Sequence, residues 1–234
     1  MKPVAGLLDR VPFPDNFSAY VVEPTDDPRV HGYTVQSDLS RHVGPEALTW
    51  LALMGELPTA AEHAALAAAL VWLAPLHVGE GPAHAAVLAR MAGTPDESLP
   101  AVVTVALGQL IAAEVATLTP LFHWLASDRR APVPEIAVAS SPEAGSAAAY
   151  AWMAAESVRW FGPERALPLG VVLTRVATAY AVLALLGVTD LPRLLALSSW
   201  ARLPLLLAEA RHHAVGAVMT YPTHVPPYQY EEAD

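Results

Sequence analysis

The sequence contains no cysteine, and its only lysine is Lys2. The lack of cysteine excludes disulfides, thiolate metal ligands and a cysteine nucleophile. With lysine confined to the second residue, Schiff-base chemistry has essentially no candidate. Charge is also scarce, since 15% of residues are charged and the net charge is −10. Because no basic cluster stands out beyond Arg129-Arg130, we expect no nucleic-acid partner.

Apolar residues, by contrast, are abundant. They make up 54% of a chain of 234 residues, which is long enough to bury a substantial core in one large domain, or in a large domain with a small one. So little charged surface relative to apolar area favours an obligate oligomer, in which some apolar helices lie against a second subunit. We therefore expect a homodimer.

Two apolar stretches are long enough to raise the question of a membrane: Leu99 to Leu118 and Ala166 to Leu186. The first contains Glu114 and the second contains Arg175, and charged groups are costly at bilayer depth. Residues Met1 to Asp27 lack the apolar run of a signal peptide. The sequence thus predicts no membrane partner and a cytoplasmic protein.

Helical periodicity dominates the chain and strand signals are scarce, so we expect an all-α fold. Proline at position 45 and glycine at position 55 bracket one apolar helix. Thr59 and Glu62 have the spacing of a capping box that opens the next helix.

Further along the chain, the helix boundaries are predicted from proline, glycine and capping residues. We expect a separate helix from Pro120 to Ser127, another from Pro163 to Leu186, and a helix capped by Asp190 that ends near Arg202, with Pro204 beginning or kinking the last one. Residues His31 to Val35 suggest a short extended pair.

The resulting domain organisation has five segments. They are an extended N-terminal arm (1–30), the first part of a large helical domain (31–130), a connecting loop with a small subdomain (131–165), the C-terminal helices of the large domain (166–220) and a C-terminal arm (221–234).

Three stretches together carry a family resemblance. These stretches resemble segments of citrate synthases and citryl-CoA lyases, and they occur in the same order. They are GYTVQSDLSRHVGPEALTWLALMGELPTAAE (Gly32 to Glu62), the histidine-bearing loop and helix from Leu76 to Gly93, and ARLPLLLAE (Ala201 to Glu209). The resemblance implies a citrate synthase-like helical fold: a dimer of subunits with a large helical domain and a small helical subdomain, with active sites between the domains and parts from both subunits.

The resemblance also implies a chemistry, in which a carbon–carbon bond is made or broken through the enol of an acyl-CoA. The family's aspartate base and its histidines are replaced here: Glu80 stands at the position of the oxoacid histidine, LIAAEVA (Leu110 to Ala116) at the second histidine, and TRVA (Thr174 to Ala177) at the aspartate. Arg202 resembles a substrate-carboxylate arginine. No resident cofactor is implied, and a CoA thioester would be a substrate.

Four residues are therefore candidates for a site. Glu80 and Glu114 are candidate acid/base residues, whereas the alternatives are a solvated loop carboxylate for Glu80 and a partly exposed or interface-paired carboxylate for Glu114. His77 either lines a substrate cleft or satisfies loop backbone groups, and Arg202 is a candidate anchor for a substrate carboxylate. The histidines lack metal-ligand spacing, so we expect no metal site.

Two functions remain open at this point. The first is a divergent citrate synthase-like protein that binds an acyl-CoA or a di- or tricarboxylate, with Claisen-type condensation or citryl-CoA-type cleavage as its reaction. The alternative is a non-catalytic pseudoenzyme that serves as a regulatory or structural partner of a true citrate synthase.

Overall fold

The computed structural model describes residues 18–216, which form mostly helices and little strand. The expected all-α class is confirmed. The predicted N-terminal arm is covered only from residue 18, and the predicted C-terminal arm lies outside the described residues. The chain divides into two compact units, Met1–Pro58 and Thr59–Asp234.

A small antiparallel sheet opens the first unit. Its strands are β1 (Val22–Glu23), β2 (Arg29–Val30) and β3 (Tyr33–Thr34), in that order. The connection between β2 and β3 is the dipeptide His31-Gly32, whose φ angles of 49° and 88° are those of a tight hairpin turn. The extended pair expected here is therefore present, with its turn at His31-Gly32.

The helices of this unit are the π-helix η2 (Val35–Leu39), α1 (Ser40–His42) and α2 (Pro45–Met54). The start of η2 is held by Asp27, whose carboxylate accepts hydrogen bonds from the Gln36 amide at 2.8 Å and the Ser37 amide at 3.1 Å. Asp27 lies in the turn between β1 and β2, so this side chain from an earlier turn satisfies two of the first amides of η2.

The local signals around the next boundary are confirmed. Gly55 ends α2 in the left-handed region with a φ of 84°. Thr59 and Glu62 form the predicted capping box, in which each side chain bonds the other residue's backbone amide. This box begins α3 (Ala60–Leu73) and with it the second unit.

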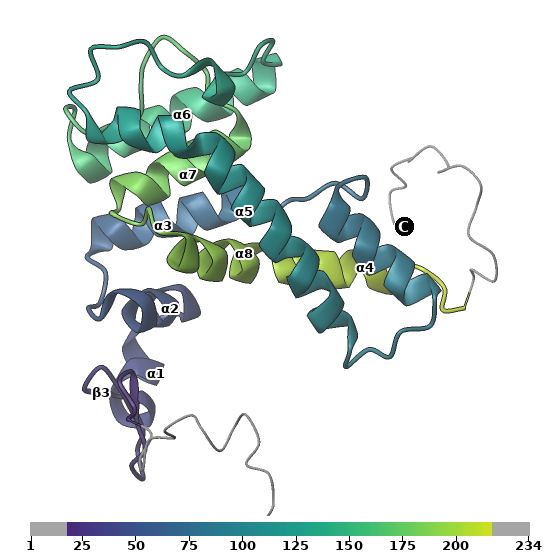
Figure 1. Cartoon of the computed structure of the whole chain (residues 1–234). Helices are drawn as coiled ribbons and strands as arrows, with labels where there is room; N and C mark the ends of the chain where they lie inside the picture. The colour runs from purple at the N-terminus through teal and green to yellow at the C-terminus, as the bar shows by residue number, and fades with distance from the viewer. Residues whose placement is uncertain (1–17, 217–234) are drawn as a thin grey trace, which may run out of the picture. The chain divides into compact units, whose positions relative to one another are not determined.

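Five further α-helices and a short 3-10 helix complete the second unit (Figure 1). They are α4 (Gly81–Met91), α5 (Leu99–Ala126), η3 (Glu135–Ala137), α6 (Ala144–Phe161), α7 (Arg175–Leu185) and α8 (Leu191–Arg211). Helices α4, α5 and α8 pack together, and α7 lies against α3, α5 and α6. An apolar stripe of four α5 residues spaced by four, Leu99, Val103, Leu107 and Ile111, faces the core between α4 and α8.

Three predicted helix boundaries were wrong. The helix expected from Pro120 to Ser127 is the last part of α5, which runs through Pro120 without a break. Likewise α8 runs through Pro204 to Arg211 as one helix. Buried side chains lie on both sides of each proline, such as Leu118 and Leu121 around Pro120, so tertiary packing offsets the hydrogen bond that the proline removes.

The third correction concerns the helix expected from Pro163. Helix α7 begins only at Arg175, because Thr174 caps it by accepting from the Ala177 amide. The segment before it instead makes an isolated β-bridge, Val138 to Leu173.

Helix α5 is, within residues 18–216, the one helix long and apolar enough to cross a bilayer by length and composition. Core helices of globular proteins pass the same test. In this structure α5 packs against α4 and α8 and carries an ion-paired glutamate in its middle.

Candidate functional site

Two charged residues occupy the inward faces of neighbouring helices in the second unit. Glu114 lies one turn after the buried Ile111 of α5, and Arg202 lies one turn before the buried Leu206 of α8. Residues three or four apart share a helix face, so each apolar stripe carries its charged residue into the same interface. Helices α5 and α8 pack against one another, which brings the two charges together.

The resulting ion pair is two-pronged. Arg202 donates from Nη1 to Oε2 of Glu114 at 2.8 Å and from Nη2 to Oε1 at 2.9 Å. The arginine side chain is fully buried and the glutamate side chain is 14% exposed. The remaining guanidinium nitrogen of Arg202, Nε, donates to the carbonyl oxygen of Leu73 at 3.1 Å. Every nitrogen of the guanidinium therefore has a partner inside the protein.

A hydroxyl pair extends this cluster into the core. The hydroxyl of Tyr180, on α7, donates to Oε2 of Glu114 at 2.8 Å, and Ser198 donates to the Tyr180 hydroxyl at 3.2 Å. Burial raises the pKa of Tyr180 well above its ordinary value, and the negative charge of Glu114 raises it further. The phenol therefore stays protonated and serves Glu114 as a hydrogen-bond donor.

The C-terminal end of α3 is the second focus of the site. Arg202 bonds the carbonyl of Leu73, and Arg175 donates to the carbonyls of Trp72 and Pro75. The last carbonyls of a helix lack intrahelical partners and carry a partial negative charge. Two arginines from α7 and α8 thus satisfy the end of α3.

The loop that follows α3 contains two of the candidate residues, His77 and Glu80. The Glu80 carboxylate accepts from the His77 amide at 2.7 Å, and Nδ1 of His77 accepts from the Gly79 amide at 3.1 Å. The loop is therefore closed by its own side chains. His77 is exposed and Glu80 half-buried.

Electrostatics connect this loop to the ion pair through Arg175. Partial burial of its guanidinium lowers the pKa of Arg175, and the positive charge of Arg202 lowers it further, whereas Glu80 and Glu114 both raise it. Arg175 thus lies within electrostatic reach of Arg202, Glu80 and Glu114. Structure brings the sequence-predicted Glu80, Glu114 and Arg202 into one electrostatic neighbourhood.

A pocket of about 600 Å³ opens beside Arg175, between the end of α3 and the first residues of α6 and α7. Trp72, Pro75 and Leu173 line its apolar part, and Arg175 and Glu143 supply charge. Its volume is within the range of small-molecule sites. Among residues 18–216, no group of three or more His, Asp or Glu side chains is placed to hold a metal ion.

Comparison with known proteins defines the fold. No protein-family model matches the sequence, and no curated protein sequence matches it. Among solved structures, the chain is similar to citryl-CoA lyase from Hydrogenobacter thermophilus, with a TM-score of 0.55, 16% identity, and coverage of 92% of this chain and 97% of that one. The chain therefore has a helical fold of the citrate synthase and citryl-CoA lyase type. At this identity the likeness shows the fold alone.

Sequence reasoning found some members of this cluster and missed others. It singled out Glu114 and Arg202 separately but did not pair them, because they lie 88 residues apart and the pairing depends on helix packing. It missed Tyr180, Ser198 and Arg175. The available signal was an arginine and a glutamate of opposite charge, each placed inside an apolar stripe. The assigned catalytic and substrate-binding roles of the four candidates stay predictions.

Proposed function

We propose that this chain is a non-catalytic protein with a citryl-CoA lyase-type fold, which acts as a regulatory or structural partner of a true citrate synthase-like enzyme. The observation that carries the proposal is the ion pair between Glu114 and Arg202. The arginine expected to clamp a substrate carboxylate is occupied by a carboxylate of its own chain.

Competition at Arg202 favours the internal carboxylate. A ligand carboxylate would have to displace Glu114 from both Nη atoms, and would leave Glu114 without its arginine in a nearly closed site. Leaving a buried charge unpaired costs several kcal/mol. A free ligand, unlike Glu114, also loses translational freedom on binding.

The residues at the family's catalytic positions point the same way. Enolisation of an acyl-CoA requires a base at the methyl carbon and a donor to the thioester oxygen. The aligned stretches here are TRVA at Thr174 to Ala177 and LIAAEVA at Leu110 to Ala116, which contain neither aspartate nor histidine. Glu114 is engaged by three hydrogen bonds, and Glu80 closes its own loop.

A second candidate function rests on the pocket beside Arg175. There an acyl-CoA or a di- or tricarboxylate would lie against Trp72 and Leu173 with its anionic group on Arg175. In that case Glu80 and Glu114 would serve as the acid and base of a Claisen-type condensation or cleavage. In this second candidate function the ligand class is the same, but the anionic group of the ligand binds Arg175 instead of Arg202.

Isothermal titration of the purified chain with CoA, acetyl-CoA, oxaloacetate and citrate separates the two. The non-catalytic proposal expects no binding that depends on Arg202, and co-purification of the chain with a complete citrate synthase-like enzyme from the same genome. Binding that is lost in Arg202→Ala, in a variant that thermal unfolding shows to be folded, would overturn it. Binding lost in Arg175→Ala, with turnover of citryl-CoA or acetyl-CoA, would establish the second candidate.

A further inference from the structure

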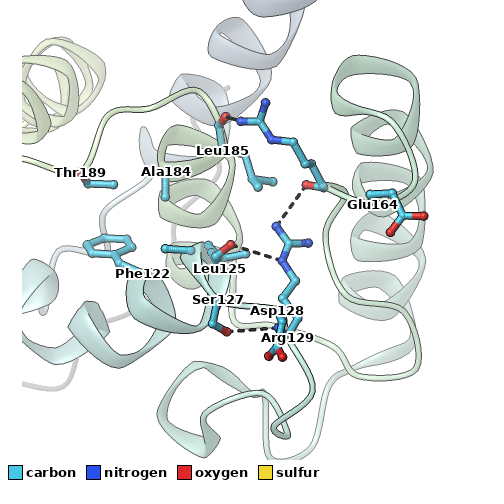
Figure 2. A pocket seen from close by; sticks show the side chains of 11 residues that line it. Phe122, Leu125, Ser127, Asp128, Arg129, Glu164, Ala184, Leu185 and Thr189 are labelled. Carbon is cyan, nitrogen blue, oxygen red and sulfur yellow. Dashed lines mark hydrogen bonds between the residues drawn. The ribbon is translucent and has the colours of Figure 1, made fainter.

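A second cavity, of about 490 Å³, lies where the C-terminal ends of α5 and α7 meet the segment after α6 (Figure 2). Its apolar wall includes Phe122, Leu125 and Leu185. Its charged lining consists of Arg129 and Arg165 together with Asp128 and Glu164. Figure 2 shows apolar side chains gathered on one side and Arg129 on the other. No residue of the Glu114 cluster lines this cavity, although the Phe122 ring meets the Tyr180 ring edge-on with the centroids 6.5 Å apart.

Within residues 18–216, the guanidinium groups of Arg129 and Arg165 donate hydrogen bonds only to backbone carbonyl oxygens. Arg129 donates to the carbonyls of Leu125, Ala166 and Arg165, at 3.4, 2.6 and 3.4 Å, and stacks over the Trp124 ring at 5.5 Å. Arg165 donates to the carbonyl of Leu185 at 2.9 Å. Carbonyl groups satisfy hydrogen bonds but carry no full charge.

Neither guanidinium is paired with a carboxylate in the described part of the chain. Asp128, adjacent to Arg129, pairs with Arg130 instead, at 3.0 Å. Figure 2 shows the Glu164 carboxylate turned away from the Arg129 guanidinium. The C-terminal ends of α5 and α7, at Leu125 and Leu185, each carry about half of a negative charge, which offsets part of the positive charge of the two arginines.

The positive charges affect one another, and the backbone at Arg129 is constrained. Burial lowers the pKa of Arg129, and the charge of Arg165 lowers it further. Arg129 also has a φ of 56°, a left-handed conformation that is uncommon for residues other than glycine. Each guanidinium has five N–H donors, of which these contacts use three in Arg129 and one in Arg165.

We propose that this cavity binds an organic anion, whose phosphoryl or carboxylate group bridges Arg129 and Arg165 while its apolar body lies against Phe122 and Leu125. Arginine pairs readily with oxyanions through two parallel N–H donors. The cavity volume suits a small ligand rather than a lone ion. The site is independent of the function proposed for the Glu114 cluster.

The test is titration of the full chain with inorganic phosphate, phenyl phosphate and benzoate. Phenyl phosphate is expected to bind at least tenfold more tightly than inorganic phosphate, because its ring fills the apolar wall. Comparison with benzoate shows whether the site prefers a phosphoryl or a carboxylate group. Binding is expected to weaken at least tenfold in Arg165→Gln and to be unchanged in Arg159→Gln, which removes an exposed arginine that does not line the cavity.

Arg165→Gln is the primary variant because Arg165 is exposed and makes one internal hydrogen bond, whereas Arg129 makes several. Thermal unfolding without ligand checks that the variant is folded. If it does not fold, Phe122→Leu replaces it and is expected to weaken phenyl phosphate but not inorganic phosphate. If none of the three probes binds, or if the wild type and Arg165→Gln bind them with equal affinity, the proposal is overturned.

Discussion

Glu114 and Arg202 meet as a two-pronged ion pair, with both oxygens of one bonded to both terminal nitrogens of the other at 2.8 and 2.9 Å. The pair lies between two apolar stripes and has little access to water. It therefore combines the specificity of a bidentate contact with the desolvation cost of a buried one.

Removal of one partner is expected to destabilise the fold strongly. Arg202→Met or Glu114→Leu should each lower the free energy of unfolding by about 3–5 kcal/mol, because each leaves an uncompensated buried charge. The double variant should cost much less than the sum of the two. Urea denaturation measures this cycle, and the exposed pair Asp128 and Arg130 is the control, with about 0.5 kcal/mol expected. Additive effects at Glu114 and Arg202 would contradict the coupling.

The vacancy left by Glu114→Gly should accept an external carboxylate. Acetate is expected to raise the melting temperature of this variant by several degrees and that of the wild type very little, since a ligand that binds only the folded state stabilises it by mass action. Chloride at equal ionic strength is the control. The double variant Glu114→Gly with Arg202→Ala should gain nothing from acetate, and a gain there would place the acetate elsewhere.

In the first unit, Asp27 should impose a pH dependence on the start of η2. Its hydrogen bonds from Ser37 and Gln36 hold the pKa of Asp27 below its ordinary value of 3.8. A depressed folded-state pKa means that the stabilisation is present above pH 3.8 and is lost as the pH falls through the lower folded value. Amide exchange at Gln36 and Ser37, measured by NMR, should accelerate over that acidic range. In Asp27→Ala it should already be fast at neutral pH, whereas the exposed Asp26→Ala should behave as wild type.

The dimer also stays a prediction, and α5 offers a place to test it. Val102 and Val105 on this helix are 39% and 67% exposed, although α5 buries its opposite face. If the expected homodimer uses this face, Val105→Glu should convert it to a monomer in analytical ultracentrifugation. Leu169→Glu, at a residue 78% exposed outside the helices, should leave the dimer intact. A monomeric wild type would refute the dimer itself.

Local capping signals were read correctly from the sequence because a cap is a contact between near neighbours. Thr59 with Glu62, Gly55 and Asp190 all act as predicted. Pro120 is predicted to begin a helix and Pro204 to begin or kink one, and both lie inside longer helices. Propensity alone favours a break at each, and only the packing of the surrounding helix residues outweighs it.

In the candidate site, too, individual residues could be predicted from the sequence, whereas contacts between distant residues could not. An acid inside the apolar stripe of α5 and an arginine inside that of α8 were visible as unusual residues. Their partnership was not, because it requires knowing that α5 and α8 are neighbours. Tyr180 and Ser198 carried no signal of their own, since buried hydroxyls are common in helices and gain meaning only from the carboxylate beside them.

The end of α3 also sets an order of events during synthesis. Its carbonyls at Trp72, Leu73 and Pro75 are bonded by arginines that lie 103, 129 and 100 residues further along the chain. A ribosome adding about 5–20 residues per second exposes α3 for several seconds before α8 follows it. During that interval the nascent chain has an apolar helix whose last carbonyls lack their arginine partners.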